Sequence, residues 1–189
     1  MRASLVALVA VVALTGSAVT ALPASANHKA ETDGGGSLGV DPADPEFEAP
    51  EDVRGRVCPT KDFWIGDGWG ADRGNRRHTG IDLHAPRGTA IFAVEDGRID
   101  RTKKQDNGSL QIVMKGDGGP KYYYGHMDEV LVGDGDRVKA GQVIALMGDT
   151  GSPGSVHLHF EYWRSGGESA VVNPANLIDR ICPKSTRSR

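Results

Sequence analysis

The sequence predicts an all-β domain, organised as a compact antiparallel sheet built from hairpins. Short segments such as SLQIVMK at 109–115 alternate apolar and polar residues, and this period of two is typical of half-buried strands. Turn-forming residues separate these segments, and the 189-residue chain contains 26 glycines. No segment shows a sustained helical period. The pattern therefore favours strands joined by tight turns over a helical fold.

The predicted elements follow one another in a simple order. After an irregular segment rich in glycine and arginine at 63–90, the Asp96-Gly97 pair indicates a hairpin within 90–104, because Asp-Gly between apolar runs favours a tight turn. Residues 173–179 are expected to form a short helical turn. Further strands are expected at 109–115, at 121–127, within 136–148 on both sides of Ala140-Gly141, and at 155–163.

The N-terminal residues have the layout of a secretory signal peptide. A positive start at Met1-Arg2 is followed by an apolar run from Leu5 to Leu14 and by the small-residue site Ala24-Ser25-Ala26, so we expect cleavage after Ala26. An uncleaved anchor helix is the alternative, but the run is shorter than the ~20 residues that a span needs. We therefore expect a protein secreted to the extracellular space or cell wall, with no membrane contact after cleavage.

The rest of the chain divides by charge. Residues 27–56 carry eight acidic and three basic residues together with three glycines in a row, which predicts a flexible acidic linker. The folded domain is expected at 57–183 and a basic C-terminal tail at 184–189. No clustered basic face is apparent, and the formal net charge is −3, so a nucleic-acid partner is not expected.

Two cysteines bracket the predicted domain. A disulfide between Cys58 and Cys182 is expected in the oxidising compartment that export implies. In the chain-entropy model, closing so long a loop contributes roughly 4–5 kcal/mol. The rival interpretation, metal-ligating or catalytic thiols, is weak because neither cysteine belongs to a CxxC pair.

Polar side chains with possible catalytic roles occur at three places. On a strand, His157 and His159 would share one face with Glu161, because alternate side chains point the same way. His78 and Asp82 are four residues apart with a glycine between them, and on an extended segment these two also share a face. Taken singly, the close histidine pair is more often structural, and His78 with Asp82 is equally typical of a surface ion pair.

Three further histidines lie outside these two pairs. His126 follows Tyr124-Gly125 at a strand end, where a histidine alone would cap a turn. His84 has no partner at ligand spacing and is expected to be a rim or surface side chain, and His28 is expected to be exposed in the linker. Taken together, three ligands drawn from histidine and carboxylate are what a catalytic Zn²⁺ uses, and further imidazoles hold or transfer protons.

Five segments occur in a distinctive order and spacing: HTGID (78–82), APRGTAIFAVEDGRI (85–99), YYGHM (123–127), GDRVKAGQVIALMGDTG (135–151) and HLHFEYW (157–163). Together they resemble the lysostaphin-type zinc endopeptidases of bacterial peptidoglycan. The resemblance extends from about Trp69 to Pro174 and implies a fold similar to the duplicated hybrid motif, with antiparallel strands lining a narrow groove that holds one Zn²⁺.

Transferred residue by residue, the resemblance implies that His78, Asp82 and His159 bind the metal. It implies that His126 and His157 are the catalytic histidines, one as general base and the other as oxyanion stabiliser, in an order that stays open. The implied substrate is the peptide part of peptidoglycan, in cross-links or stems, with glycine bridges and D-alanyl to diamino-acid links both possible. A monomer is expected.

Two other interpretations compete with a zinc endopeptidase. Some proteins with this fold have lost metal ligands and act only as wall-binding or regulatory modules, but the ligand set here shows no substitution. Residues 132–145 also resemble a hairpin of lipoyl or biotinyl carrier domains, yet Lys139 lacks the flanking motif of a modified lysine. Val156 stands where the peptidase family usually has proline, so the groove walls are expected to differ from those of the family.

Overall fold

The computed structural model describes residues 47–165 and 167–184. Within these residues it contains one ten-stranded antiparallel sheet and one short α-helix, which confirms the predicted all-β class. The strands are β1 (Trp64–Ile65), β2 (Ile81–His84), β3 (Ala90–Phe92), β4 (Gly97–Lys104), β5 (Leu110–Gly116), β6 (Lys121–Val130), β7 (Arg137–Val138), β8 (Val143–Met147), β9 (Leu158–Trp163) and β10 (Val171–Val172). The 3-10 helix η2 (Glu168–Ala170) and the helix α1 (Ala175–Ile181) follow β9.

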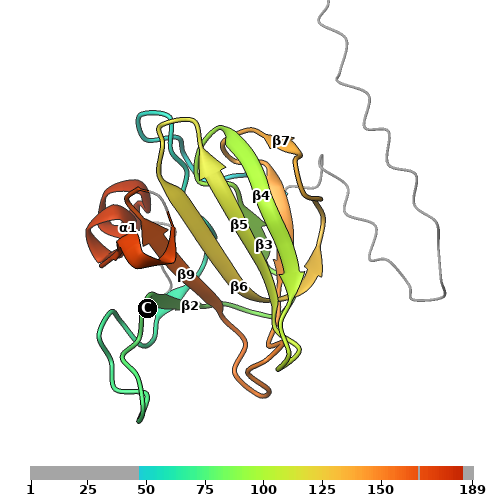
Figure 1. Cartoon of the computed structure of the whole chain (residues 1–189). Helices are drawn as coiled ribbons and strands as arrows, with labels where there is room; N and C mark the ends of the chain where they lie inside the picture. The colour runs from blue at the N-terminus through green and yellow to red at the C-terminus, as the bar shows by residue number, and fades with distance from the viewer. Residues whose placement is uncertain (1–46, 166, 185–189) are drawn as a thin grey trace, which may run out of the picture. The chain divides into compact units, whose positions relative to one another are not determined.

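The strand order places segments that are distant in the sequence side by side. The main path runs β1-β2-β9-β6-β5-β4-β7, while β8 pairs with both β3 and β6, and β10 pairs with β9. Figure 1 shows β9, β6, β5 and β4 next to one another, with α1 beside β9. Because β2 lies against β9, Asp82 is the direct cross-strand partner of His159.

The predicted hairpins are only partly correct. The alternating segments around residues 110 and 121 do pair with each other, as β5 and β6. The hairpin expected at Asp96-Gly97 is wrong, because β3 pairs with β8 and β4 pairs with β5 and β7. The Asp96 carboxylate instead accepts hydrogen bonds from the backbone of Ala140 (2.9 Å) and from Nζ of Lys139 (2.7 Å). This aspartate therefore anchors a distant turn and does not close a local one.

The core lies on one face of the sheet. Phe160, Tyr122 and Tyr124 are fully buried there, and the Phe160 ring lies 6.1 Å and 5.5 Å from the two tyrosine rings between centroids. The amphipathic helix α1 adds three apolar side chains, Leu177, Ile178 and Ile181. Because these side chains of β6 and β9 point into the core, the residues that alternate with them point to the opposite face of the sheet.

The two ends of the domain are covalently joined. Cys58, before β1, forms a disulfide with Cys182, at the end of α1, across a sequence separation of 124. The expected pair is thus present in the structure. Arg56, at the end of the segment expected to be a linker, forms an ion pair of 2.9 Å with Glu95.

Several expectations fall outside the described residues. These are the signal peptide at 1–26, residues 27–46 of the acidic segment, and the tail at 185–189. Among the residues that the structure describes, no helix combines the length and the apolar character needed to cross a membrane.

Candidate metal centre

The side chains of His78, Asp82 and His159 meet on the sheet face opposite the core. Asp82 lies on β2 and His159 on β9, while His78 lies in the loop that leads into β2. All three are largely buried, with His78 and Asp82 exposed by 2% and 3%. A Cβ atom at Gly80 would lie only 2.8 Å from Cε1 of His159. The glycine between His78 and Asp82 therefore makes room for the third side chain.

Each of the three side chains directs one atom at the other two. Nε2 of His78 lies 2.9 Å from Nδ1 of His159 and 3.0 Å from Oδ1 of Asp82, and that oxygen lies 3.0 Å from Nδ1 of His159. The other ring nitrogens have acceptors of their own: Nδ1 of His78 donates to the Gly68 carbonyl (2.8 Å), and Nε2 of His159 donates to Glu161 (3.0 Å).

This arrangement fits a bound cation. Carbonyl and carboxylate oxygens only accept hydrogen bonds, so in the neutral histidines the two nitrogens that face each other carry lone pairs. Together with Oδ1 of Asp82, three lone pairs converge, and they repel unless a proton or a metal ion lies among them. Two imidazoles and one carboxylate, each held by a further hydrogen bond, are a donor set that suits Zn²⁺.

The close approach of these three side chains also shifts the pKa values of Asp82 and His159. Burial alone would raise the pKa of Asp82, but hydrogen bonds with His159 and His78 hold it far below its usual range. Burial alone would lower the pKa of His159, yet hydrogen bonds to Asp82 and Glu161 raise it. A metal ion has to displace a proton from such a cluster, so its affinity depends on pH.

Glu161 is the side chain that holds His159 in place. Two residues further along β9 on the same face, its carboxylate accepts hydrogen bonds from Nε2 of His159 (3.0 Å), Oγ1 of Thr79 (2.5 Å) and Nε1 of Trp163 (2.7 Å). Burial would raise the pKa of Glu161, and these three donors together lower it. The carboxylate is therefore ionised and fixed, and it leaves Nδ1 of His159 free for the metal centre.

Arg73 holds the other oxygen of Asp82. Nη2 of Arg73 forms an ion pair with Oδ2 of Asp82 and lies 3.2 Å from Oδ2 of Asp67. Asp82 thus directs Oδ1 toward the two histidines and Oδ2 toward the guanidinium. This division leaves the carboxylate a single oxygen for the metal centre.

His126 and His157 border the same space. His157 lies just before β9, and its Nε2 is 3.7 Å from Oδ1 of Asp82. The centroid of its ring lies 4.6 Å from that of His126. His126 has a φ of 71°, a left-handed conformation that is uncommon for residues other than glycine and often marks functional sites. The five residues singled out in the sequence therefore lie together.

The backbone fixes the tautomers of these two rings. Nδ1 of His126 lies 2.7 Å from the Thr150 carbonyl oxygen, and Nδ1 of His157 lies 2.7 Å from that of Ser155. Each Nδ1 is therefore a donor, and each Nε2 is left as an acceptor. Burial lowers the pKa of His126 to about 4 and also lowers the pKa of His157. Both rings are therefore neutral at pH 7, with Nε2 unprotonated.

Two cavities meet at this cluster. One of about 230 Å³ contains His78, Asp82 and His157 in its lining, and another of about 450 Å³ contains Tyr123 and Glu161. Four residues line both cavities: Arg76, Asn107, His126 and His159.

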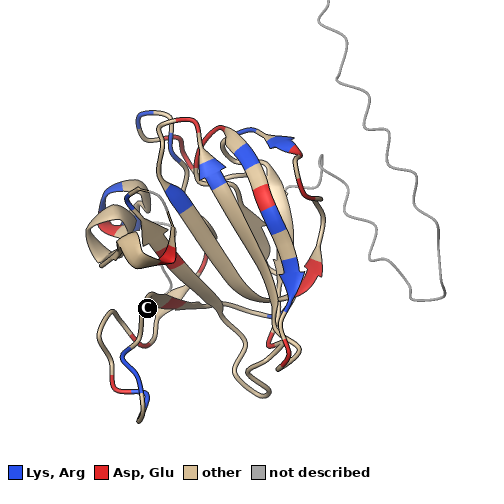
Figure 2. Cartoon of the chain, in the orientation of Figure 1, with Lys and Arg blue, Asp and Glu red and all other residues tan. Residues whose placement is uncertain are grey.

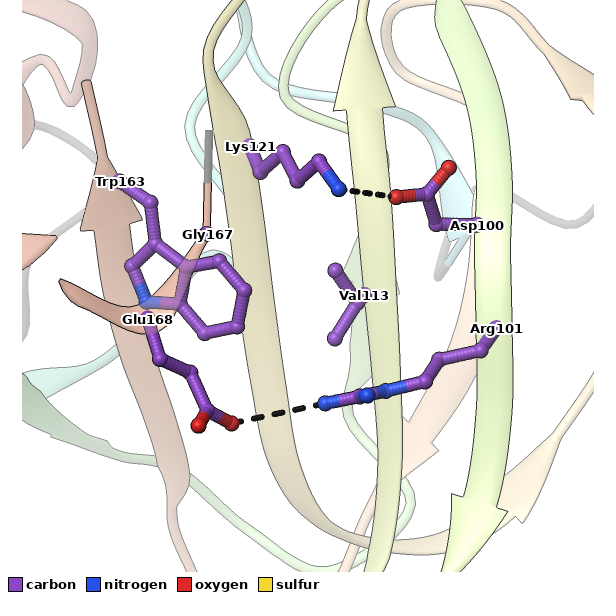
Figure 3. A pocket seen from close by; sticks show the side chains of 7 residues that line it. All are labelled: Asp100, Arg101, Val113, Lys121, Trp163, Gly167 and Glu168. Atoms are coloured by element: carbon purple, nitrogen blue, oxygen red, sulfur yellow. Dashed lines mark hydrogen bonds and ion pairs between the residues drawn. The ribbon is translucent and has the colours of Figure 1, made fainter. Parts of the chain in front are cut away.

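A third cavity continues along the sheet. It has a volume of about 270 Å³ and shares Glu168 with the second cavity. Figure 3 shows Trp163 on one side of it, Val113 in the middle and Arg101 on the other side. Since these residues belong to β9, β5 and β4, the cavities together follow the exposed face of the sheet away from the metal centre.

His84 has a closer relation to the site than expected from the sequence. It lies on β2, two residues after Asp82, and is half-buried. Its ring stacks on Trp64 at 4.9 Å and lies 5.1 Å from the His157 ring between centroids, and its Nδ1 donates to the Val156 carbonyl (3.0 Å). The sequence did contain a signal for this placement, because Asp82 and His84 are two residues apart on one strand and therefore point to the same face.

Known proteins share this fold. The catalytic domain of lysostaphin, an antimicrobial peptidase from Staphylococcus simulans, is 29% identical in sequence and superposes with a TM-score of 0.56, covering 62% of this chain and 92% of that one. Among curated proteins, the peptidoglycan DD-endopeptidase ShyB of Vibrio cholerae is 37% identical over 84 residues, which are 44% of this chain and 20% of ShyB. The murein hydrolase activator NlpD of Salmonella dublin is 40% identical over 122 residues, which are 61% of this chain and 30% of NlpD.

The curated relatives are larger proteins, and the chain spans between 20% and 35% of the length of those it matches. A family model shows which part is shared. The model of peptidase family M23 matches residues 76–174, just over half of the chain. That range contains all five residues singled out for the site, and the chain belongs to peptidase family M23.

Proposed function

We propose that this chain is an exported zinc-dependent endopeptidase that hydrolyses peptide bonds in the cross-links or stems of bacterial peptidoglycan. One observation carries the proposal: three converging acceptor atoms lie in the same cavity as two histidines whose Nε2 atoms are unprotonated. Membership of the M23 family supports a peptidase, and the signal-like residues 1–26 support export. The envelope-related names of the relatives agree with a cell-wall substrate.

In the proposed mechanism, His78, Asp82 and His159 hold the zinc ion. Zinc bound there would supply Lewis acidity and lower the pKa of a coordinated water. Glu161 and Arg73 orient two of the ligands from outside. The metal centre is thus assembled from side chains whose free rotation has already been removed by hydrogen bonding.

His126 and His157 would move the protons. Each begins neutral, with Nδ1–H held by a backbone carbonyl and Nε2 as an acceptor. One Nε2 removes a proton from the attacking water. That ring then delivers the proton to the leaving amine nitrogen as the C–N bond breaks. The other ring, after taking up a proton from solvent at Nε2, would donate it as a hydrogen bond to the carbonyl oxygen that gains negative charge. We assign the roles of general base and oxyanion stabiliser to His126 and His157 as a pair, without dividing them between the two rings.

A non-catalytic wall-binding or regulatory module is the second candidate. The similarity to NlpD, which is named as a murein hydrolase activator, favours it. A module that only binds has no need of an intact ligand set with two further histidines beside it. The complete set of five residues therefore favours the enzyme.

The first test is mass spectrometry of fragments released from purified peptidoglycan by the zinc-loaded protein. We expect new peptide termini that disappear when a chelator removes the zinc. The cleaved termini would also identify the bond. Intact peptides from several wall types, with zinc shown to be bound, would refute the enzyme and support the regulatory module.

Two variants test the assigned roles. His159→Ala should lose both zinc and activity because it removes a ligand. His157→Ala should retain zinc and lose most of its activity. If His157→Ala empties the site while His159→Ala leaves it filled, the assignment of the close pair is reversed.

A further inference from the structure

The loop between β1 and β2 carries three arginines, and two of them are already paired. Arg73 forms ion pairs with Asp82 and Asp67, as described above. Arg77 lies 3.8 Å from Asp72 and donates to the Gly70 carbonyl at 3.4 Å. Figure 2 shows basic and acidic segments close together in this loop.

Arg76 differs from its two neighbours. Within residues 47–165 and 167–184, its side chain makes no hydrogen bond or ion pair. It lines both cavities that meet at His159. Burial raises the pKa of Tyr123 to about 12, and Arg76 is among the cations that oppose this rise. Arg76 is itself exposed, and it lies at the rim of the cavity that Tyr123 also lines.

The other charged groups along these cavities have partners. Glu161 accepts three hydrogen bonds, and Glu168 lies 3.5 Å from Arg101. Figure 3 shows the pair of Arg101 and Glu168 and a second pair, between Lys121 and Asp100 at 2.5 Å. The carboxylates that line the cavities are thus balanced. Among the described residues that line them, Arg76 supplies a cation that no carboxylate within 47–165 and 167–184 balances.

A guanidinium in this position is suited to one kind of ligand. Arginine binds a carboxylate through two parallel N–H donors, and such charge-assisted bonds are about twice as strong as neutral ones. A peptide that lies across both cavities passes Arg76 close to the metal centre. Peptidoglycan stems carry free carboxylates near their cross-links, whereas the interior of a glycine bridge carries none.

We propose that Arg76 binds a free carboxylate of the substrate, so that the chain selects an acidic peptide over a neutral glycine bridge. This inference rests on the proposed function, since it identifies the class of peptide for the same site. Arg76 acts here as a specificity-determining residue. It needs no contact with the atoms that react.

The test compares two synthetic cross-linked stem peptides that differ in one group. One carries a free carboxylate on the residue next to the D-alanyl bond, and the other carries a carboxamide there. Binding to the zinc-loaded full chain and cleavage by it are measured separately for both peptides. Arg76→Gln is the test variant. Arg77→Gln, in the same loop but not lining either cavity, is the matched control, and Arg76→Lys tests partial rescue.

We expect the wild-type protein to bind and cleave the acid peptide roughly 10- to 100-fold better than the amide, as for other hydrogen bonds to charged groups. Arg76→Gln should remove this preference, because it should weaken the binding and cleavage of the acid peptide and leave those of the amide unchanged. Arg77→Gln should keep the preference. Equal treatment of the two peptides by the wild-type protein, or an equal loss for both in Arg76→Gln, would overturn the inference and leave the peptidase intact. Selective binding without any cleavage would instead refute the proposed function and retain the carboxylate site.

Discussion

Glu161 offers a sharp test of how the metal centre is held. The substitution Glu161→Gln keeps the size of the side chain but removes its charge and replaces one acceptor oxygen with an amide donor. In the wild-type protein, all three groups that contact this carboxylate are donors: Nε2 of His159, Oγ1 of Thr79 and Nε1 of Trp163. At least one of them therefore faces another donor in the variant.

The expected loss can be worked out from these contacts. A carboxylate that holds a metal-ligating histidine from outside typically contributes 10- to 100-fold to metal affinity. This corresponds to about 1.4–2.7 kcal/mol at 1.36 kcal/mol per tenfold change. We therefore expect the Kd for zinc to rise by roughly one to two orders of magnitude in Glu161→Gln, because Nδ1 of His159 is no longer held toward the site.

The assay is a competition titration of the metal-free protein with zinc and a chromogenic chelator at pH 7.5. Thermal unfolding of each variant confirms that it is folded. Glu168→Gln is the control, because Glu168 lines the same cavity but pairs with Arg101 and contacts neither histidine of the centre. An affinity in Glu161→Gln close to that of the wild-type protein, or an equal loss in the control, would refute the reasoning.

Three further predictions concern packing, the disulfide and pH. Gly80→Ala should weaken zinc binding at least tenfold in the same titration, since its Cβ would lie 2.8 Å from Cε1 of His159; unchanged affinity would show that the ring can move. Replacing Cys58 and Cys182 together by serine should lower the free energy of unfolding in urea by ~5 kcal/mol in the chain-entropy model, and an unchanged midpoint contradicts this. Burial lowers the pKa of His126 to about 4 from 6.5, so between these pH values the unfolded chain binds more protons than the folded one. The free energy of unfolding of the zinc-free protein should therefore fall by up to ~3 kcal/mol as the pH is lowered through this range. His126→Asn should flatten that part of the stability profile, and an identical profile in the variant argues against a buried neutral ring.

The fold could be predicted where the determining contacts are local. The alternation around residues 110–127 and the turn residues between its halves predicted two successive strands, and these pair with each other as β5 and β6. The same reasoning failed at Asp96-Gly97, because the Asp96 side chain bonds to Lys139 and Ala140, more than 40 residues away. A two-residue turn motif carries no information about such a distant partner.

The metal ligands were predicted from the resemblance of five segments to a known family, and strand spacing explains only part of that set. Asp82 and His159 lie on strands, and a period of two predicts which way each points. The contact of Arg73 with Asp82 could not be predicted in this way, because loop residues have no periodicity. The orientation of His126 also depends on a left-handed backbone conformation, which sequence alternation does not report.

The hydrogen bonds of the histidine rings have a consequence for how robust the site is to mutation. His78, His84, His126 and His157 each donate Nδ1–H to a main-chain carbonyl, so replacing a neighbouring side chain leaves their tautomers unchanged. Among the histidines in the described ranges, His159 is the exception, since the carboxylate of Glu161 sets its tautomer. Random side-chain substitutions around the site should therefore be tolerated at most neighbouring positions. Substitution of Glu161 alone, in contrast, should disturb the tautomer of His159 and with it the metal centre. Loop insertions that displace a carbonyl should be far more damaging than side-chain exchanges in the same loops.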